Sequence, residues 1–303
     1  MTMVPTQHAL ALDIGGSHVS AAVVDLESRS ILETTETRAA VDANASAEAM
    51  LEVWSSTALA AHEQAGSPTI ARIGIAMPGP FEYTTGISRL EHKFAALYGS
   101  DVGAALQQRA FEQRFGKVPL AFGNDATLFA LGEWWAGAAR GHRRVLGLTL
   151  GTGLGGGFVV DGQPCYQGTG LPPNGAIWNL PYQNGIAEDF VSGRALERAY
   201  FGRTGCKVTP VELAQLAQAG DADAMAAFLE LGEHLGRVLK PWVQAFNPGC
   251  LVVGGNLARA WMLFRDSLEE ELDDQQLVVC PSALFDRANL LGAAALEIKR
   301  GEA

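Results

Sequence analysis

The same pattern occurs twice in this chain, as ALALDIGGSHVSAAVVD from Ala9 to Asp25 and as LGLTLGTGLGGGFVVDG from Leu146 to Gly162. Each stretch has an apolar run, a turn of small residues and a second apolar run that ends in Val-Val-Asp. The apolar runs predict strands, and a glycine turn lets main-chain N–H groups approach a phosphate without hindrance from a Cβ. Because the unit is repeated, the sequence indicates a duplicated architecture that handles the phosphates of ATP.

Two other phosphate-binding patterns fit the sequence less well. Residues Gly151 to Gly156 also fit G-x-G-x-x-G, the pattern of dinucleotide-binding proteins. That pattern needs a helix that begins at the glycines, whereas here they lead directly into Phe158-Val159-Val160 and a turn at Asp161-Gly162. Neither turn ends in the lysine and hydroxyl pair of a P-loop. The hairpin interpretation is therefore favoured for both turns.

Composition and charge restrict the class of protein. A chain of 303 residues exceeds the usual size of a single core, which predicts two lobes. Hydrophobic residues make up 48% and charged residues 18%, as in globular proteins with a large core. The net charge of −11 argues against nucleic acid or an anionic membrane as the main partner. We expect a cytoplasmic protein, since neither a signal peptide nor an apolar run of transmembrane length is evident.

The cysteines do not suggest a metal or disulfide framework. There are four, dispersed along the chain without a C-x-x-C pair: Cys165, Cys206, Cys250 and Cys280. Structural zinc sites and disulfide scaffolds usually show local cysteine spacing. We therefore expect reduced thiols of a cytosolic protein.

Strands and helices are predicted to alternate, which indicates the α/β class. Beyond the two hairpins, strands are expected at residues 30–38, 73–77, 118–122, 251–253 and 277–280. Helices are expected after the N-cap Ser46, at 126–139, 187–200 and 221–246, after Gly255, and at 288–299. The helix at 221–246 is expected to turn Met225 and Leu229 inward and to kink at Pro241. Residues 82–103 and 168–185 are predicted to be long loops. The predicted lobes are residues 1–121 plus 288–303, and residues 122–287.

Asp13 is the candidate residue for a metal ion. It ends a predicted strand directly before Gly15, Gly16 and Ser17. A carboxylate beside a phosphate is unfavourable unless a cation lies between them, so we assign Asp13 to Mg²⁺, held through water. The alternative is a turn aspartate that binds its own backbone. The second hairpin favours the metal role.

Asp125 is the candidate general base. It follows Asn124 at a predicted junction between strand and helix. Phosphoryl transfer to an alcohol needs positioning, charge neutralisation and a carboxylate that accepts the hydroxyl proton. The alternative role for this pair is helix N-capping. The two roles are compatible, because Asn124 can cap the helix or bind ligand while Asp125 reaches the substrate.

Five motifs in a fixed order carry a resemblance that covers nearly the whole chain. They are Asp13-Ile-Gly-Gly-Ser, Pro78-Gly79, Asn124-Asp125-Ala followed by Gly132-Glu133, Leu150-Gly-Thr-Gly-Leu-Gly-Gly-Gly157, and Asn247-Pro248 before Gly254-Gly255. Together they resemble the ROK family of bacterial sugar kinases, within the actin, hexokinase and Hsp70 superfamily. The resemblance implies a duplicated, two-lobed actin-like or ribonuclease H-like α/β fold with an interlobe cleft. It also implies ATP and Mg²⁺ as cofactors, a monosaccharide or related polyol as substrate, and a homodimer.

The resemblance also assigns roles to residues. The turns bind the ATP phosphates through Gly15, Gly16 and Ser17 and through Gly151, Thr152 and Gly153, while Gly254 and Gly255 border the adenosine. Asp125 is the catalytic base, and the sugar is bound by Gly79, Asn124, Asp125 and Glu188. Glu188, in Ala-Glu-Asp-Phe-Val-Ser-Gly, matches the later sugar-binding glutamate of the family.

This sequence departs from the family pattern in two places. The family often has a zinc motif of one His and three Cys before the later glutamate, but residues 180–187 contain no cysteine, which predicts a zinc-free member. The family usually has Gly-Glu-Ile-Gly-His, and the aligned stretch here is Gly175-Ala176-Ile177-Trp178-Asn179. Ala176 and Asn179 thus replace a glutamate and a histidine that contact the sugar. Either the substrate differs from glucose-like hexoses or the affinity for sugar is reduced.

Two alternatives to a kinase follow from the same resemblance. One is a catalytically weak sugar-binding sensor, which Ala176 favours because its side chain accepts no hydrogen bond. The other is a sugar-responsive transcription regulator, since ROK relatives include repressors. A repressor needs an N-terminal helix-turn-helix module, and only twelve residues precede Asp13. With the negative net charge as well, the regulator is disfavoured.

Overall fold

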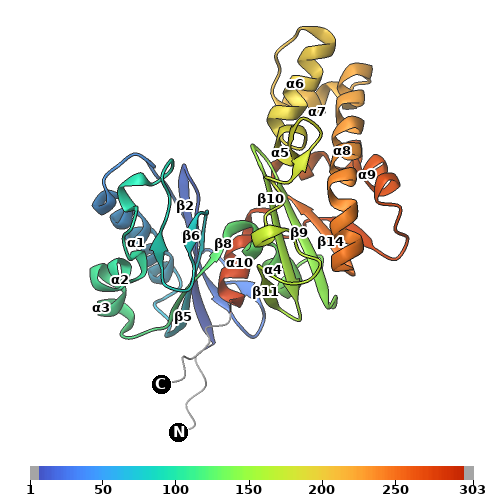
Figure 1. Ribbon diagram of the computed structural model, residues 1–303. Helices are drawn as coiled ribbons and strands as arrows, with labels where there is room; N and C mark the ends of the chain where they lie inside the picture. Colours follow the sequence, from blue (N-terminus) through green and yellow to red (C-terminus); the bar gives the residue numbers. More distant parts are fainter. Residues whose placement is uncertain (1–6, 297–303) are drawn as a thin grey trace. The chain divides into compact units, whose positions relative to one another are not determined.

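The computed structural model describes residues 7–296, and the chain divides into two compact units (Figure 1). One unit joins Met1–Ala136 to the C-terminal part from Asp286, and the other is Gly137–Phe285. The boundary falls after α4 (Asp125–Ala136), whereas the sequence suggested residue 121. The reason is the packing of α4 on α10 (Ala288–Ala295). Gly132 and Gly292 permit it, because a Cβ on either would collide with the backbone of the opposite helix.

The first unit is built on a six-stranded sheet. Its strands are β1 (His8–Ile14), β2 (His18–Asp25), β3 (Ser30–Ile31), β4 (Thr37–Ala40), β5 (Ile70–Met77) and β8 (Leu120–Asn124). The order is β3-β2-β1-β5-β8, and β4 pairs with β2 as well. β1 and β2 are antiparallel, whereas β1, β5 and β8 are parallel.

The sheet of the second unit repeats this topology. Its strands are β9 (Arg144–Leu150), β10 (Leu154–Val160), β11 (Gln163–Cys165), β14 (Cys250–Gly254) and β15 (Val278–Pro281). The order is β11-β10-β9-β14-β15, with an antiparallel hairpin followed by two parallel strands. The duplication predicted from the two glycine turns is thereby confirmed.

Helices cover the sheets, and the first of them forms as its sequence predicts. α1 (Ala47–Gln64) begins after Ser46, whose Oγ accepts a 3.2 Å hydrogen bond from the Ala49 N–H, and it packs against β2. Residues Met50, Leu51, Trp54 and Ala58 are buried on one face, as expected. The other α-helices are α2 (Val102–Leu106), α3 (Glu112–Phe115), α5 (Ala187–Phe190), α6 (Gly193–Thr204), α7 (Pro210–Gln218), α8 (Ala222–Phe246) and α9 (Arg265–Leu272).

Short helices and hairpins occupy the connections. The 3₁₀ helices are η1 (Ala95–Leu97), η3 (Pro173–Gly175), η4 (Asn256–Leu263) and η5 (Phe285–Arg287), and η2 (Gln107–Phe111) is a π-helix between α2 and α3. Two small hairpins pair β6 (Phe81–Glu82) with β7 (Ile87–Ser88), and β12 (Pro181–Tyr182) with β13 (Gly185–Ile186). The two predicted loops therefore contain short elements.

Several boundaries differ from the sequence-based expectations. The strand expected at 30–38 is two strands, and the helix expected at 187–200 is broken because Ser192 is extended and caps α6. α7 was not predicted, and the segment after Gly255 is a 3₁₀ helix before it becomes α9. Leu229 on α8 is 41% exposed, so its expected inward orientation is wrong. Pro241 lies inside α8. α10 ends at Ala295, and residues 297–299 of the predicted helix lie outside the described residues.

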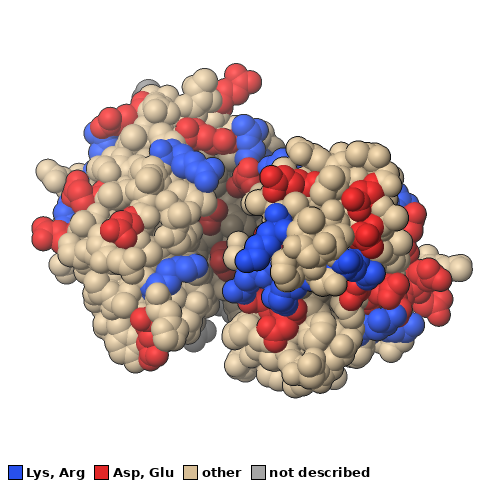
Figure 2. Space-filling model, turned by 90° about the horizontal axis from the view of Figure 1, so that it is seen from above, with Lys and Arg blue, Asp and Glu red and all other residues tan. Residues whose placement is uncertain are grey.

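The surface carries charges of both signs. In the face shown in Figure 2, Lys and Arg side chains alternate with Asp and Glu over both units. No helix within residues 7–296 combines the length and apolarity needed to cross a membrane.

Candidate active site

The first glycine turn joins β1 to β2. The Gly15 N–H donates a 2.9 Å hydrogen bond to the His18 carbonyl and closes the turn. Asp13 lies at the end of β1, opposite Ser20 of β2. A feature that the sequence did not reveal is the contact of Lys93 with Gly16: a Cβ built on Gly16 would lie 2.9 Å from Cε and 3.1 Å from Nζ of Lys93, so the lysine can hold this position only because the glycine has no side chain. The turn thus has a carboxylate on one side and an ammonium group against its backbone.

Asp13 is held in an environment that favours a bound cation. Burial raises the pKa of its carboxyl group to about 6, and the negative charge of Asp125 acts in the same direction. Asn289 on α10 donates a 3.1 Å hydrogen bond to Asp13 Oδ1, which lowers the pKa, as does the charge of Arg38. A desolvated carboxylate bonded to a neutral amide fits a hard cation such as Mg²⁺. Residues 7–296 contain no cluster of three or more His, Cys, Asp or Glu that could hold a metal by themselves.

Asn124 and Asp125 lie where β8 passes into α4. Asn124 Oδ1 accepts a 3.2 Å hydrogen bond from the Thr127 N–H, so this side chain caps the helix. Its Nδ2 donates a 3.2 Å hydrogen bond to Tyr83 Oη, which in turn donates to the Met77 carbonyl at 3.2 Å. The capping role that the sequence left open is therefore present, and it fixes the orientation of the Asn124 amide.

Asp125 has the environment of a proton acceptor. Its Oδ1 accepts a 2.8 Å hydrogen bond from the Ala126 N–H. Burial raises the pKa of the carboxyl group, whereas the Ala126 hydrogen bond and the charge of Lys93 lower it. A carboxylate made more basic by burial is suited to remove a proton from an alcohol. Gly79 lies beside the hydrogen-bonded pair Tyr83 and Asn124: a Cβ on it would be 3.3 Å from Tyr83 Oη and 3.9 Å from Asn124 Nδ2.

The second glycine turn joins β9 to β10 in the other unit. The Gly151 N–H donates to the Gly153 carbonyl at 3.0 Å, and the Gly193 N–H at the start of α6 donates to the Gly151 carbonyl at 2.8 Å. Thr152 is the exposed residue at the tip. The small residues here are also needed for packing, because a Cβ on Gly153 would collide with the carboxylate of Glu188.

The Glu188 side chain is hydrogen-bonded to the backbone beside this turn. Its Oε2 accepts a 3.0 Å hydrogen bond from the Leu154 N–H, and its Oε1 forms a 2.8 Å ion pair with Arg194. The structure thus brings the later glutamate of the family next to the turn formed by residues 151–153. Arg194 was not identified from the sequence.

The segment that departs from the family pattern lies in the same unit. Ile177 is buried and touches β10, since a Cβ on Gly156 would collide with it. Trp178 is 46% exposed, and its carbonyl accepts a 2.9 Å hydrogen bond from the Glu188 N–H. Ala176 is half-buried, and Asn179 is exposed. Residues 176–179 and Glu188 therefore form one local arrangement.

Gly254 is the last residue of β14, Gly255 follows it, and both lie against the end of β9. Gly254 pairs with Thr149, and Gly255 has a φ of 79°. A Cβ on Gly255 would collide with the Leu150 backbone, so glycine is required both by conformation and by space. The second glycine turn and this pair are neighbours in one unit, as the adenosine and phosphate assignments require.

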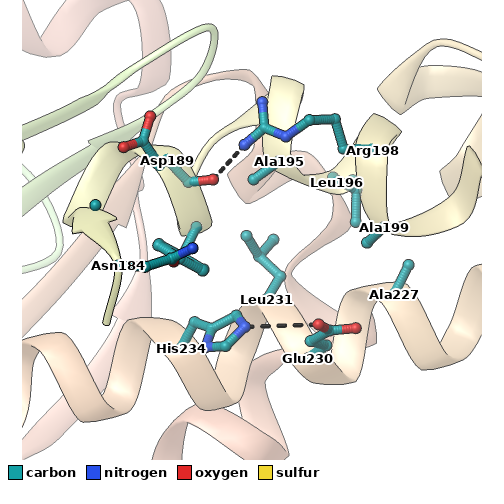
Figure 3. A pocket seen from close by; sticks show the side chains of 12 residues that line it. Asn184, Asp189, Ala195, Leu196, Arg198, Ala199, Ala227, Glu230, Leu231 and His234 are labelled. Atoms are coloured by element: carbon teal, nitrogen blue, oxygen red, sulfur yellow. Dashed lines mark hydrogen bonds and ion pairs between the residues drawn. The ribbon is translucent and has the colours of Figure 1, made fainter. Parts of the chain in front are cut away.

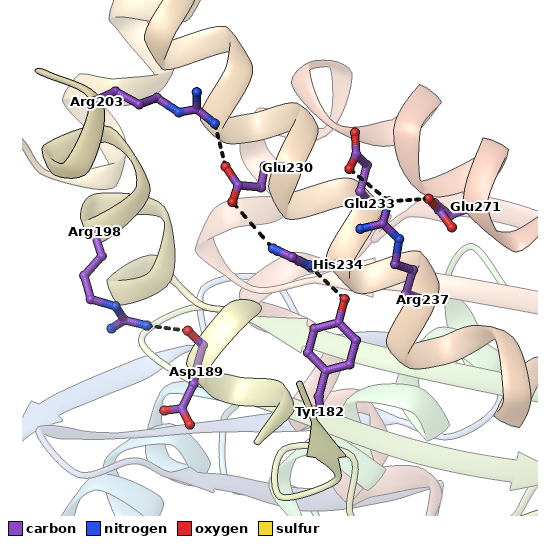
Figure 4. Close-up of polar contacts among 9 residues, drawn as sticks. All are labelled: Tyr182, Asp189, Arg198, Arg203, Glu230, Glu233, His234, Arg237 and Glu271. Carbon is purple, nitrogen blue, oxygen red and sulfur yellow. Dashed lines mark hydrogen bonds and ion pairs between the residues drawn. The ribbon is translucent and has the colours of Figure 1, made fainter. Parts of the chain in front are cut away.

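A separate cavity of about 550 Å³ lies among α5, α6 and α8 (Figure 3). It is lined by Asn184, Gly185, Asp189, Phe190, Ala195, Leu196, Arg198, Ala199, Ala227, Glu230, Leu231 and His234. None of the sequence-predicted site residues lines it. Much of its lining is alanine and leucine, and among its polar groups Arg198 donates to the Asp189 carbonyl and His234 pairs with Glu230 (Figures 3 and 4).

Next to this cavity, a ring cluster fastens the β12–β13 hairpin to α8. Tyr182 Oη and His234 Nδ1 are hydrogen-bonded at 2.8 Å, and His234 Nε2 is 3.6 Å from Glu230 Oε1 (Figure 4). The Phe190 ring contacts both aromatic partners edge-on, with centroid distances of 5.2 Å to Tyr182 and 5.4 Å to His234. Of these three residues, only Tyr182 lies in residues 180–187, the segment in which the family often has its zinc motif.

Comparison with known proteins identifies the family. The sequence model of the ROK family matches residues 9–300. The chain belongs to the ROK family. Among curated relatives, the glucokinase of Thermotoga maritima is 26% identical, and the match covers 96% of this chain and 98% of that protein.

Solved structures of the ROK family have the same fold. The ROK hexokinase of Thermus thermophilus is 28% identical with a TM-score of 0.76, over 95% of this chain and 97% of that one. A ROK glucokinase of Streptomyces griseus, solved with glucose and AMPPNP, is 24% identical with a TM-score of 0.74, over 95% and 98%. The actin-like ATPase fold expected from the motifs is confirmed.

Proposed function

We propose that this ROK protein transfers the terminal phosphoryl group of ATP to a hydroxyl of a monosaccharide or related polyol, with Asp125 as general base. At the level of enzyme class it is an ATP-dependent sugar kinase, as family membership and the named relatives support. The observation that carries the finer assignment is the partly buried Asp125 carboxylate, whose pKa is raised by desolvation beside the fixed Asn124 amide.

The chemistry assigned to this chain is simple. Asp125 accepts the proton of the substrate hydroxyl as its oxygen attacks the terminal phosphorus, and the bond to the bridging oxygen of ADP breaks. Sugar hydroxyls are bound by Gly79, Asn124, Asn179 and Glu188. The main-chain N–H groups of the two glycine turns bind the phosphates. When bound, Mg²⁺ neutralises phosphate charge, and Asp13 holds it through water.

The test is ADP release from ATP and Mg²⁺ in the presence of a panel of aldohexoses, N-acetylated hexosamines, ketohexoses and polyols. At least one acceptor should give turnover far above ATP hydrolysis alone, and mass spectrometry should find that acceptor carrying one phosphoryl group. Nucleotide binding with sugar binding but no turnover on any acceptor would contradict the kinase and favour the second candidate.

That second candidate is a catalytically weak sugar-binding sensor of the same fold. It is favoured by Ala176, a half-buried residue without a polar side chain where the family has a sugar-contacting glutamate. The sensor should bind sugar with turnover close to background.

We also propose that the enzyme needs no zinc, that it acts in the cytoplasm and that it is a homodimer by family resemblance. The ring cluster of Tyr182, Phe190 and His234 supports the first of these, since it fastens the β12–β13 hairpin through side chains alone. Light scattering on a gel-filtration column measures the oligomeric state, and a mass equal to one chain would contradict the dimer.

A further inference from the structure

Lys93 lies against the first glycine turn, although it comes from the connection between β7 and η1. The absence of a side chain at Gly16 lets this lysine reach the backbone of the turn, because a Cβ there would be 3.1 Å from Nζ. The side chain of Lys93 is exposed, and within residues 7–296 it forms no ion pair. An exposed lysine normally extends into water, so its position over a backbone turn calls for a cause.

The backbone at Lys93 is fixed by its neighbour. Phe94 is fully buried, and its ring lies edge-on to Trp54 at 5.4 Å between centroids. The Phe94 N–H donates a 3.1 Å hydrogen bond to the Ala43 carbonyl, and Phe94 adopts the left-handed conformation with a φ of 58°. Because this buried aromatic residue directly follows Lys93, it restricts the positions that the Lys93 ammonium group can reach.

Lys93 acts on both parts of the site in the first unit. Its charge lowers the pKa of Asp125, the proposed base, while its Nζ lies at Gly16, the proposed phosphate turn. The transferred phosphoryl group must pass between these two points. A cation at this place neutralises charge on the equatorial oxygens during transfer, which is the main task in phosphoryl transfer.

We propose that the Lys93 ammonium group contacts the terminal phosphoryl group of ATP and stabilises its charge as it moves to the hydroxyl held by Asp125. This inference rests on the proposed kinase function. It predicts that Lys93 distinguishes nucleotides by their third phosphate and contributes little to the binding of ADP or sugar.

The experiment compares Lys93→Met and Lys93→Arg with the wild type, and Lys117→Met is the control at another exposed lysine. Calorimetry with Mg²⁺ and without sugar gives Kd for ADP and for AMPPNP. We expect Lys93→Met to weaken AMPPNP binding roughly 10- to 100-fold, since one charge-assisted contact is lost, and ADP binding less than about 3-fold. Lys93→Arg should recover part of the AMPPNP affinity, and Lys117→Met should match the wild type.

With a sugar accepted by the wild type, Lys93→Met should lower kcat about 10²-fold or more and leave the KM for sugar within about 3-fold. Unchanged AMPPNP affinity together with a raised KM for sugar would overturn the inference and make Lys93 a sugar-binding residue. Equal weakening of ADP and AMPPNP would overturn it too. Both results leave the kinase function intact, whereas a wild type that binds neither nucleotide overturns the function and the inference together. Melting temperatures establish that each variant is folded.

Discussion

Asn289 on α10 donates a hydrogen bond of 3.1 Å from Nδ2 to Oδ1 of Asp13, although 276 residues separate the two in sequence. α10 packs against β1 and β5, so the C-terminal part of the chain packs on the sheet that carries the first glycine turn. The amide satisfies one carboxylate oxygen without cancelling its charge. Asp13 therefore keeps the charge that a bound cation needs.

Replacement of Asp13 by asparagine should stabilise the folded protein at neutral pH. The pKa of about 6 in the folded protein exceeds the ordinary aspartate pKa of 3.8, so the folded state binds more protons than the unfolded chain between these values. The free energy of unfolding contributed by this group therefore falls as pH rises from about 4 to 6, by about 3 kcal/mol in all. Without Mg²⁺, Asp13→Asn should melt higher than the wild type at pH 7.5, and the difference should shrink toward pH 5. A difference in melting temperature that does not change with pH would contradict the raised pKa of Asp13.

Removal of the proposed base should abolish most phosphoryl transfer. Asp125→Asn keeps an oxygen that can accept from the Ala126 N–H, so the fold should be preserved. We expect kcat to fall about 10²–10⁴-fold, with Kd for AMPPNP nearly unchanged. Asp161→Asn, at a surface ion pair with Arg143 in the other unit, is the matched control and should retain wild-type kcat. Near-normal turnover by Asp125→Asn would make the base assignment wrong.

The elements that the sequence predicted well are those whose signal is local. The two hairpins follow from alternating apolar runs around glycine, and α1 begins at Ser46 because a serine hydroxyl can bond the free N–H groups of the first turn. The strand-to-helix junction at Asn124 and Asp125 is local in the same sense.

Residues that tertiary packing brings to the site could not be predicted from the local sequence. Asn289, Tyr83 and Lys93 reach the first-unit site from a distant helix and from irregular connections, whose paths depend on buried anchors such as Phe94. The error at Leu229 has a related cause. The apolar periodicity of α8 does not say which of two adjacent leucine and phenylalanine side chains meets a partner, and here Phe228 is buried instead.

A larger residue at Gly153 should displace the Glu188 side chain. A Cβ there would collide with the Glu188 carboxylate, which must then leave the Leu154 N–H. We expect Gly153→Ala to lower kcat/KM for both ATP and sugar at least about 10-fold, since about 1.4 kcal/mol is tenfold and a lost hydrogen bond to a charged group contributes 1.5–3 kcal/mol. Gly202→Ala on α6 is the control, because nothing lies within 4 Å of its Cβ position. It should keep activity and gain up to about 1 kcal/mol of stability. Equal activities for the two variants would contradict this role of the turn.

The ring cluster should stabilise the second unit without zinc. Tyr182→Phe keeps the ring contacts with Phe190 and removes the 2.8 Å hydrogen bond to His234 Nδ1. We expect a loss of about 0.5–1.5 kcal/mol in the free energy of unfolding, measured by urea denaturation. Tyr98→Phe, at a side chain that is 53% exposed, should change it little. Elemental analysis of the purified wild type should find no stoichiometric zinc. Zinc that is lost together with activity on chelation would overturn the zinc-free assignment.

Whether Ala176 lines the sugar site bears on whether the substrate differs from glucose-like hexoses. The residue is half-buried and directly precedes the buried Ile177. The carbonyl of Trp178, two residues further on, accepts a hydrogen bond from the Glu188 N–H. Ala176 is therefore tied to the proposed sugar-binding glutamate through the backbone. Asn179, three residues on, still offers an amide donor and acceptor.

Ala176→Glu should restore an acceptor for one or two sugar hydroxyls. A charge-assisted hydrogen bond contributes roughly 1.5–3 kcal/mol, which corresponds to an approximately 10- to 150-fold gain in affinity for a glucose-like hexose. Ala176→Leu adds volume without an acceptor and should give no gain. The measurements are KM and kcat for a panel of sugars, with melting temperature for each variant. Unchanged kinetics in a well-folded Ala176→Glu protein would place this position outside the sugar site. In that case the replacement of the family glutamate would no longer indicate an altered substrate, because the half-buried alanine would serve only the packing of residues 168–185.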